Sequence, residues 1–133
     1  MGNVTRYNAK DTVVMVGGVY ITGLGEDMIS GEKSEDNVSA AVGAQGDVVA
    51  NEVNNDLGEI TITVQGTSPQ KAYLLELAKT KEMVEVWVIN KNIGEKMGGT
   101  QCQIKKTPSL EYSAELADRE FTFLVYDYTV DVA

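Results

Sequence analysis

Apolar and polar residues alternate with a period of two along much of this chain. In residues 59–65, apolar side chains occupy every even position and polar side chains every odd position. Residues 110–116 repeat the pattern. Because successive side chains of a strand point to opposite faces of a sheet, both segments are predicted to be half-buried strands.

Several further segments have the composition of strands. The apolar run 12–16 is followed by Gly17-Gly18 and then by residues 19–21, which predicts a β-hairpin with a glycine turn. Residues 84–89 are nearly all apolar, which predicts a central strand. Other strands are expected at residues 28–34, 38–42, 48–54 and 101–105.

The last predicted strand changes its apolar face. Apolar and aromatic residues occupy odd positions from Phe121 to Val125 and even positions from Tyr126 to Val130. Side chains alternate strictly in a strand, so the switch requires a bulge or a strand that leaves one sheet and joins another. Either feature is typical of the corner of a β-sandwich or barrel.

One helix is predicted at residues 69–81. Ser68 can cap it, Pro69 suits its first turn, and leucines and alanines form an apolar stripe that we expect to pack on a sheet. The glycine-rich segment 91–100 is predicted to be a mobile loop. Without linkers or repeats, residues 1–133 are expected to form a single domain, with residues 1–10 as a flexible N-terminal arm.

The composition removes several kinds of catalytic chemistry. The chain has no histidine and one cysteine, Cys102, which excludes an internal disulfide, a Cys/His zinc cluster and a nucleophile with a histidine base. Cys102 shares a face with Ile104 and is expected to fill the core. Among twenty acidic residues no spacing selects a catalytic pair. We therefore expect no enzyme, with no catalytic residue, cofactor or metal ligand.

Acidic residues are concentrated in one quarter of the chain. The formal net charge is −9, and residues 25–58 hold eight acids against one base, Lys33. A surface that grips phosphates needs the opposite sign, so tight nucleic-acid binding is not expected. A solvated acidic face that favours solubility is the simplest interpretation. A wall past which nucleic acid slides without sticking is the alternative.

Two short motifs and one aromatic residue do not support a binding site. Gly23-Leu24-Gly25 lacks the third glycine of a dinucleotide fingerprint, and residues 54–59 lack the spacing of a calcium loop, so both are interpreted as turns. Trp87 is expected in the core rather than on a sugar platform. The chain has neither a secretory signal nor an apolar run of about 18 residues, so cytoplasmic synthesis and no membrane partner are expected.

Several short segments follow one another in a characteristic order: residues 17–25 (GGVYITGLG), 34–37 (SEDN), 42–48 (VGAQGDV), 54–64 (NNDLGEITITV) and 67–69 (TSP). Over about residues 11–130, this order resembles the tail tube proteins of contractile-tailed phages or phage-like particles. The resemblance implies a mainly β fold of two packed antiparallel sheets with one flanking helix, shared with type VI secretion tube proteins. It carries no catalytic residue.

The resemblance also implies an assembly and its partners. Hexameric rings stack into a tube, four strands of each subunit join into an inner barrel, and DNA or effectors pass without specific binding. Sheath, baseplate and tail-terminator proteins are the implied partners, in a virion or phage-like particle assembled in the bacterial cytoplasm. The chain departs from the commoner family pattern at residues 49–52, which are neutral to acidic where basic residues are expected.

Two sets of residues are predicted to serve this assembly. Polar alternate positions are expected to face the channel: Glu32, Ser34, Glu52, Asn54, Thr61 and Thr63. The glycine-rich segment is expected to become ordered at contacts between rings: Lys91, Asn92, Gly94, Glu95, Lys96, Gly98 and Gly99.

Three alternative functions stay open at this point. A type VI secretion or injection-system tube subunit differs in biological setting rather than in physics. A monomeric carbohydrate-binding β-sandwich would expose Trp87 and tyrosines on one sheet. A carboxylate glycosidase would need a cleft that a domain of this size seldom provides.

Overall fold

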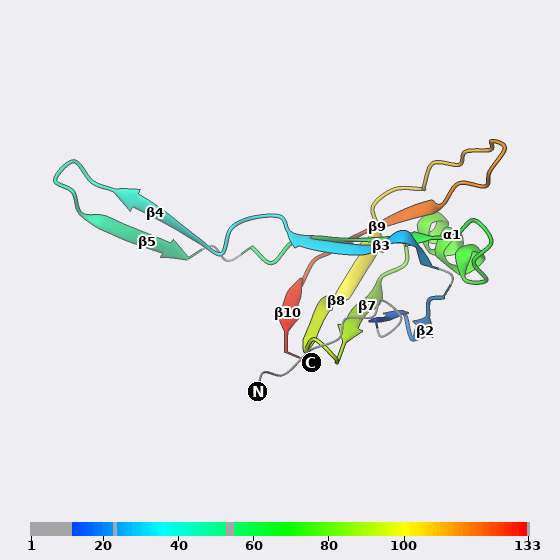
Figure 1. The fold of residues 1–133 in the computed structure, drawn as a ribbon. Helices are drawn as coiled ribbons and strands as arrows, with labels where there is room; N and C mark the ends of the chain where they lie inside the picture. Colours follow the sequence, from blue (N-terminus) through cyan, green and yellow to red (C-terminus); the bar gives the residue numbers. More distant parts are fainter. Residues whose placement is uncertain (1–11, 23, 53–54, 133) are drawn as a thin grey trace, which may run out of the picture.

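The computed structural model describes residues 12–22, 24–52 and 55–132 (Figure 1). The predicted N-terminal arm, residues 1–10, lies outside the described residues. The elements in chain order are β1 (Thr12–Val16), β2 (Val19–Tyr20), β3 (Leu24–Lys33), β4 (Val38–Val42), β5 (Val48–Glu52), β6 (Gly58–Val64), α1 (Lys71–Thr80), β7 (Val84–Asn90), β8 (Glu95–Ile104), β9 (Arg119–Val125) and β10 (Thr129–Asp131).

The strands form two antiparallel sheets. The large sheet has the order β2-β1-β7-β8-β9-β6-β3, with β10 also paired to β8, and the small sheet is the β4–β5 hairpin. In Figure 1, β3, β6 and β9 run together above β7, β8 and β10. The sheet turns between β8 and β9, where only residues 102–104 pair with residues 123–125. The predicted fold, mainly β with two antiparallel sheets and one helix, is confirmed.

The core lies between the two halves of the large sheet. Alternate residues of β1 and β7 meet alternate residues of β6 and β9, and the aromatic centre is Phe121 and Phe123, both with no exposed surface. Leu74 and Leu77 of α1 close one end of this core. The apolar positions of the alternating segment 59–65 are therefore the buried face of β6. Cys102 is a core residue, as expected.

The predicted helix cap is wrong. The helix begins at Lys71 rather than Pro69, and its N-cap residue Gln70 makes no side-chain capping bond. The Ser68 hydroxyl donates instead to the Thr22 carbonyl at 2.7 Å, and Gln70 Oε1 accepts from the Thr22 N–H at 2.9 Å. These side chains fasten the start of the helix to the β2–β3 connection, a long-range use that local sequence does not reveal.

The predicted mobile loop 91–100 is also wrong, because β8 begins at Glu95 and only residues 91–94 form the turn. Gly94 occupies a left-handed position in that turn, with φ 71°. Gly98 has φ 148° and lies so close to β7 that a Cβ would collide with the Val86 carbonyl and the Trp87 ring. The glycines of this segment permit close contact between strands rather than mobility.

The predicted strand at 110–116 is absent, and residues 105–118 form no named strand or helix. A single bridge joins Tyr112 to Leu116. Leu110 and Leu116 are half exposed, and Tyr112 is 80% exposed. The alternation here does not indicate half-burial, because the segment has no partner strand and extends beyond the end of the large sheet (Figure 1).

The predicted interruption near residue 125 is confirmed. β9 ends at Val125, and β10 continues along the same partner, β8, after three residues that leave the ladder. Within that gap the Asp127 carboxylate accepts from the N–H groups of Thr100 and Gln101, each at 3.0 Å. The change of apolar phase therefore marks a bulge-like break that Asp127 holds against β8.

Candidate assembly surfaces

The outward side of β3, β6 and β9 is largely polar, apart from Leu124, which lies beside Glu59. In the register of these strands Ser30 lies beside Thr61, which lies beside Thr122, and the two threonine hydroxyls are 3.3 Å apart. Ile60 and Ile62 point to the opposite side, into the core. The polar face, as we name it, comprises Ser30, Glu32, Glu59, Thr61, Thr63, Glu120 and Thr122.

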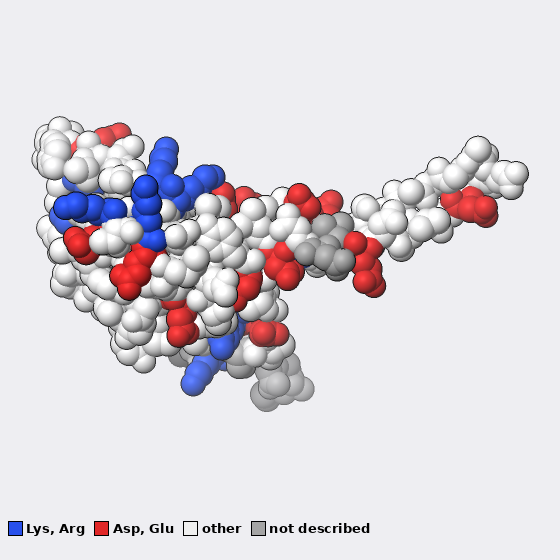
Figure 2. Space-filling view, turned by 180° about the vertical axis from the view of Figure 1, so that it is seen from behind, with Lys and Arg blue, Asp and Glu red and all other residues white. Residues whose placement is uncertain are grey.

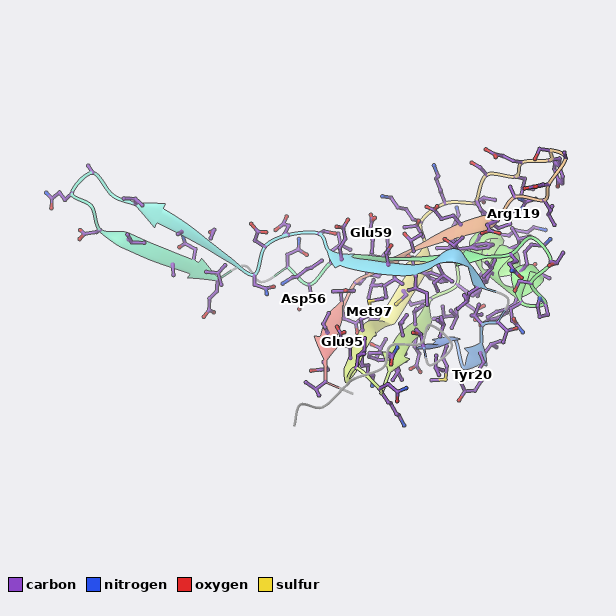
Figure 3. All side chains as sticks on the ribbon, in the orientation of Figure 1. Tyr20, Asp56, Glu59, Glu95, Met97 and Arg119 are labelled. Carbon is purple, nitrogen blue, oxygen red and sulfur yellow. The ribbon has the colours of Figure 1, made fainter. Side chains whose placement is uncertain are left out.

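The polar face is acidic, with one nearby lysine. Glu32 and Glu59 are direct cross-strand partners, an arrangement in which like charges repel. Lys105 offsets this repulsion, since its Nζ lies 2.8 Å from Glu59 Oε1. Figure 3 shows Glu59 on the side of this layer away from Met97. The face offers hydroxyls and carboxylates to water, and beside Glu59 it borders a cavity that holds Lys81, Lys105 and Lys106.

The β4–β5 hairpin projects from the body of the molecule (Figure 1). We call residues 34–52 the arm. All ten residues of its two strands are exposed, including Val42 at 70% and Val48 at 68%. The pairing places five apolar side chains on one side of the hairpin: Val38, Ala40, Val42, Val48 and Ala50. One side of the arm is therefore an uncovered apolar stripe.

The arm is built by local sequence. The Gly43 N–H donates to the Asp47 carbonyl at 2.7 Å, and Gly46 takes a positive φ of 87°, so glycine shapes the turn. At the base, Lys33 Nζ donates to Asn37 Oδ1 at 2.6 Å. Within residues 34–52 there is no lysine or arginine, and the four acids are Glu35, Asp36, Asp47 and Glu52.

Lysines surround a groove between the C-terminal part of α1, the end of β8 and β9, and this groove borders the polar face through Lys105 and Leu124. The cavity has a volume of about 290 Å³, and its lining combines charge with apolar surface: Lys81, Lys105 and Lys106 with Gln103, Thr107, Ala78, Ile104 and Leu124. Gln103 joins the two walls, donating through Nε2 to the Lys81 carbonyl at 2.8 Å. Figure 2 shows lysine side chains gathered on the upper part of the body. We call this cavity the basic groove.

Arg119 fastens the segment 105–118 beside the groove. Only 2% of this side chain is exposed. Its Nη1 donates to the Ala117 carbonyl at 2.7 Å, and its guanidinium lies 5.6 Å from the centre of the Tyr112 ring. Among the described residues it has no carboxylate partner, and Nε has no hydrogen-bond partner. Its buried charge is stabilised by backbone carbonyls and an aromatic ring.

The family model of the bacteriophage PhiTE tail tube protein matches residues 4–130. The chain belongs to this tail tube family. The match covers the polar face, the arm and the basic groove together. No curated protein matches the sequence significantly.

Solved structures share the fold of this tail tube family member at low sequence identity. A chain of the anti-feeding prophage tube-terminating cap has a TM-score of 0.71 and 13% identity, over 100% of this chain and 95% of that chain. A chain of the sheath/tube terminator of an extracellular contractile injection system has a TM-score of 0.72 and 15% identity, over 96% and 97%. A chain of the sheath-tube complex of such a system has a TM-score of 0.71 and 15% identity, over 96% and 93%.

The structure brings together three of the six residues predicted to face a channel. Glu32, Thr61 and Thr63 share the polar face. Ser34 lies exposed at the base of the arm, its N–H donating to the Leu57 carbonyl, and Glu52 lies on the arm itself. Asn54 lies outside the described residues. Sequence reasoning missed Glu120 and Thr122, whose position follows only from the β6–β9 register.

The seven residues predicted for ring contacts do not form one loop. Lys91, Asn92 and Gly94 lie in the β7–β8 turn, whereas Glu95, Lys96, Gly98 and Gly99 belong to β8. Gly98 and Gly99 are buried inside the sheet. The arm, which has the exposed apolar surface of a contact element, was predicted only as two strands. The uncovered apolar stripe depends on those strands leaving the body, which alternation alone does not show.

Trp87 is not a core residue, contrary to the prediction. It lies half-buried on the outer face of β7, opposite Val86 and Val88. Its indole Nε1 donates to Glu85 Oε2 at 3.0 Å, and Lys96 Nζ lies 4.4 Å from the ring centre. A sugar platform needs an open aromatic face, and this ring has a lysine over it, so the structure gives no support to carbohydrate binding.

A cavity of about 420 Å³ opens between β3, β7, β8 and β10. Its lining includes Ile29, Val88, Met97 and Tyr128, with Glu95 as its one carboxylate among the described residues. Glu95 and Met97 are labelled in Figure 3. Burial raises the pKa of the Tyr128 phenol, and the charge of Glu32 adds to the effect. One carboxylate does not supply the pair that glycoside hydrolysis requires.

Two searches of the described residues concern other kinds of site. Residues 12–22, 24–52 and 55–132 contain no group of three or more Cys, Asp and Glu side chains arranged to hold a metal ion. In the same part of the chain, no helix is both long and apolar enough to cross a membrane.

Proposed function

We propose that this chain is the repeating subunit of an inner tail tube, assembled as stacked hexameric rings in a contractile phage tail or phage-like particle. The open edge of β3 carries the proposal. β3 has ten residues and, within the described part of the chain, pairs only with β6. A long unpaired edge is a template for a strand of another chain, and closing strands into a ring removes it.

In that ring the polar face of β3, β6 and β9 lines the channel. Its side chains stand opposite the core, so the strands that close the ring also present Glu32, Thr61 and Thr63 to the lumen. Carboxylates and hydroxyls suit the passage of DNA or effectors without specific binding, because phosphates are repelled rather than held.

The structure supports a repeating subunit over a terminator. A terminator ends a stack and needs one stacking surface, whereas a repeating subunit needs two complementary ones. This chain has two unlike surfaces, the projecting arm and the basic groove on the body (Figures 1 and 2). Two unlike surfaces on one chain produce head-to-tail assembly, which continues as a tube. Sheath, baseplate and terminator proteins are then its partners, and the particle its location after assembly in the bacterial cytoplasm.

Negative-stain electron microscopy of the purified protein over a range of concentrations tests this proposal. Rings or tubes with a central hole are expected, with their number rising with concentration. Protein that stays monomeric up to millimolar concentration, by sedimentation velocity on the same samples, would contradict it. Stacks that stop at one or two rings would instead favour a terminator.

A further inference from the structure

The cavity between β3, β7, β8 and β10 is open and largely apolar. Its volume of about 420 Å³ suits a bound group, whereas packed protein interiors leave few voids larger than a water molecule. Two apolar side chains of its lining are exposed, Ile93 at 39% and Val130 at 59%. Figure 3 shows Glu95 and Met97 of its wall beneath β3. Exposed apolar surface around a hollow of this size indicates that another segment or molecule covers it.

The cavity lies at the end of β1 that is remote from α1. The helix is attached to the last residue of β1, since the Tyr73 hydroxyl donates to the Val16 carbonyl at 3.2 Å. Thr12, the first residue of β1, lies at the opposite end of the strand and forms part of the cavity wall. The chain therefore enters β1 from the wall of the cavity, and residues 1–11 are joined directly to it.

The eleven residues before β1 have side chains that match the cavity. They include the aromatic Tyr7 and two bases, Arg6 and Lys10, against one acid. The cavity has apolar walls and one carboxylate among the described residues, Glu95, which has no ion pair within them. The base of the same wall, Lys96, lies over an aromatic ring, with its Nζ 4.4 Å from the ring centre. A segment with an aromatic ring and positive charge is therefore complementary to this site.

We propose that residues 1–11 fold back over the cavity of their own chain, with the Tyr7 ring among its apolar side chains and the bases of the segment beside Glu95. Five residues of extended chain span up to roughly 17 Å, so Tyr7 can enter the cavity from Thr12. The segment then closes one end of the core as α1 closes the other. This docking is independent of the proposed tube function, because it occurs within a free subunit.

Disulfide formation in the full-length free subunit tests the position of the segment. Tyr7→Cys/Val130→Cys places one thiol in the segment and one in the cavity lining, while the native Cys102 is buried. The matched control is Tyr7→Cys/Val13→Cys. Val13 is 40% exposed and, as the neighbour of the buried Val14, points away from the core. A free segment would link more readily to position 13, because closing a shorter loop costs less entropy.

The docked segment is expected to reverse this preference. Linkage to position 130 should be at least about tenfold faster than linkage to position 13, because docking raises the effective concentration of the two thiols. Peptide mass spectrometry of dilute, oxidised protein measures both rates. Equal rates, or faster linkage to position 13, would overturn the proposal. Dimers on a non-reducing gel would place the segment on a second copy and would also overturn it.

A dye that fluoresces in apolar surroundings tests the chemistry of the contact. Tyr7→Ser removes the ring that fills the cavity, so Nile red fluorescence should be about twofold or more above wild type. Tyr20→Ser, the same change at a 61% exposed tyrosine of β2 outside the cavity, should match wild type. The apolar stripe of the arm contributes equally to all three proteins. Equal fluorescence of Tyr7→Ser and wild type, with unchanged circular dichroism, would overturn the docking, whereas tubes of wild-type protein would still support the proposed function.

Discussion

At the scale of single residues, glycine shows how one residue type serves opposite purposes. Gly94 and Gly98 lie four positions apart, and both have positive φ. Around Gly94 the space is open, whereas Gly98 lies against the Val86 carbonyl and the Trp87 ring. The sequence shows three glycines in residues 94–99 but not which of them closes a turn and which permits contact between strands.

The pair yields a prediction about stability. Gly94→Ala is expected to lower the free energy of unfolding by about 1 kcal/mol. The space around Gly94 is open, so the only destabilising effect is the left-handed backbone conformation that alanine must adopt. Gly98→Ala adds a collision with β7 and is expected to cost about 3 kcal/mol or more. Urea unfolding followed by circular dichroism measures both. Equal losses in the two variants would mean that residues 94–99 form a loop after all.

Asp127 is the residue that joins β9 and β10 to their common partner. Its carboxylate is partly buried, which by itself raises its pKa, but hydrogen bonds from the Thr100 hydroxyl and the N–H groups of Thr100 and Gln101 outweigh burial and lower it. A lowered pKa in the folded state means that the carboxylate stabilises the fold above the ordinary pKa of an aspartate. That contribution is lost as the pH falls below about 4.

We predict that Asp127→Ala lowers the free energy of unfolding by about 1 to 2 kcal/mol near neutral pH, because two N–H groups of β8 lose their acceptor. The difference from wild type should shrink as the pH falls and Asp127 becomes protonated. Asp131→Ala, the same change at an exposed position of β10, is the control. Chemical unfolding at pH 7 and pH 3 measures the effect, and a difference independent of pH would contradict the assignment.

At the scale of elements, the sequence predicted the features that depend on a single segment of the chain. The alternation of residues 59–65, the glycine turn after β1 and the apolar run of β7 each reflect one strand and one buried face. Residues 110–116 alternate equally well but have no partner strand, which the segment itself cannot show. The polar face was predicted in part, from β6 and Glu32 of β3. Glu120 and Thr122 belong to the polar face because β9 pairs with β6, a strand about sixty residues away in the sequence, and the segment around them does not show this pairing.

The polar face leads to an accessibility prediction. In Thr63→Cys the new thiol lies on this face, and in Thr80→Cys it lies at the exposed end of α1. Cys102 does not compete, because burial raises the pKa of its thiol to about 12. In free subunits both new thiols should react with a 5-kDa maleimide polymer, which is about the size of a small protein domain. In assembled tubes only Cys at 80 should react, and equal labelling there would place the polar face outside the channel.

At the scale of the whole molecule, the fold separates stability from assembly. The large sheet curves so that β1 and β7 pack on β6 and β9, and every core side chain comes from these strands, their neighbours or α1. The arm contributes no residue to that core. We therefore expect the chain to fold as a free subunit in which the arm stays exposed until another copy binds.

Removal of the arm tests this separation. Replacing Val38–Glu52 with a short glycine-serine link should leave the unfolding temperature within a few degrees of wild type, because no buried contact is lost. Assembly should stop at single rings, since the open edge of β3 is intact while the stacking contact is gone. Thermal unfolding and electron microscopy of the same preparation read the two properties separately. Tubes of normal length from this variant would show that stacking needs other surfaces, and an unfolded variant would show that the arm belongs to the structural core.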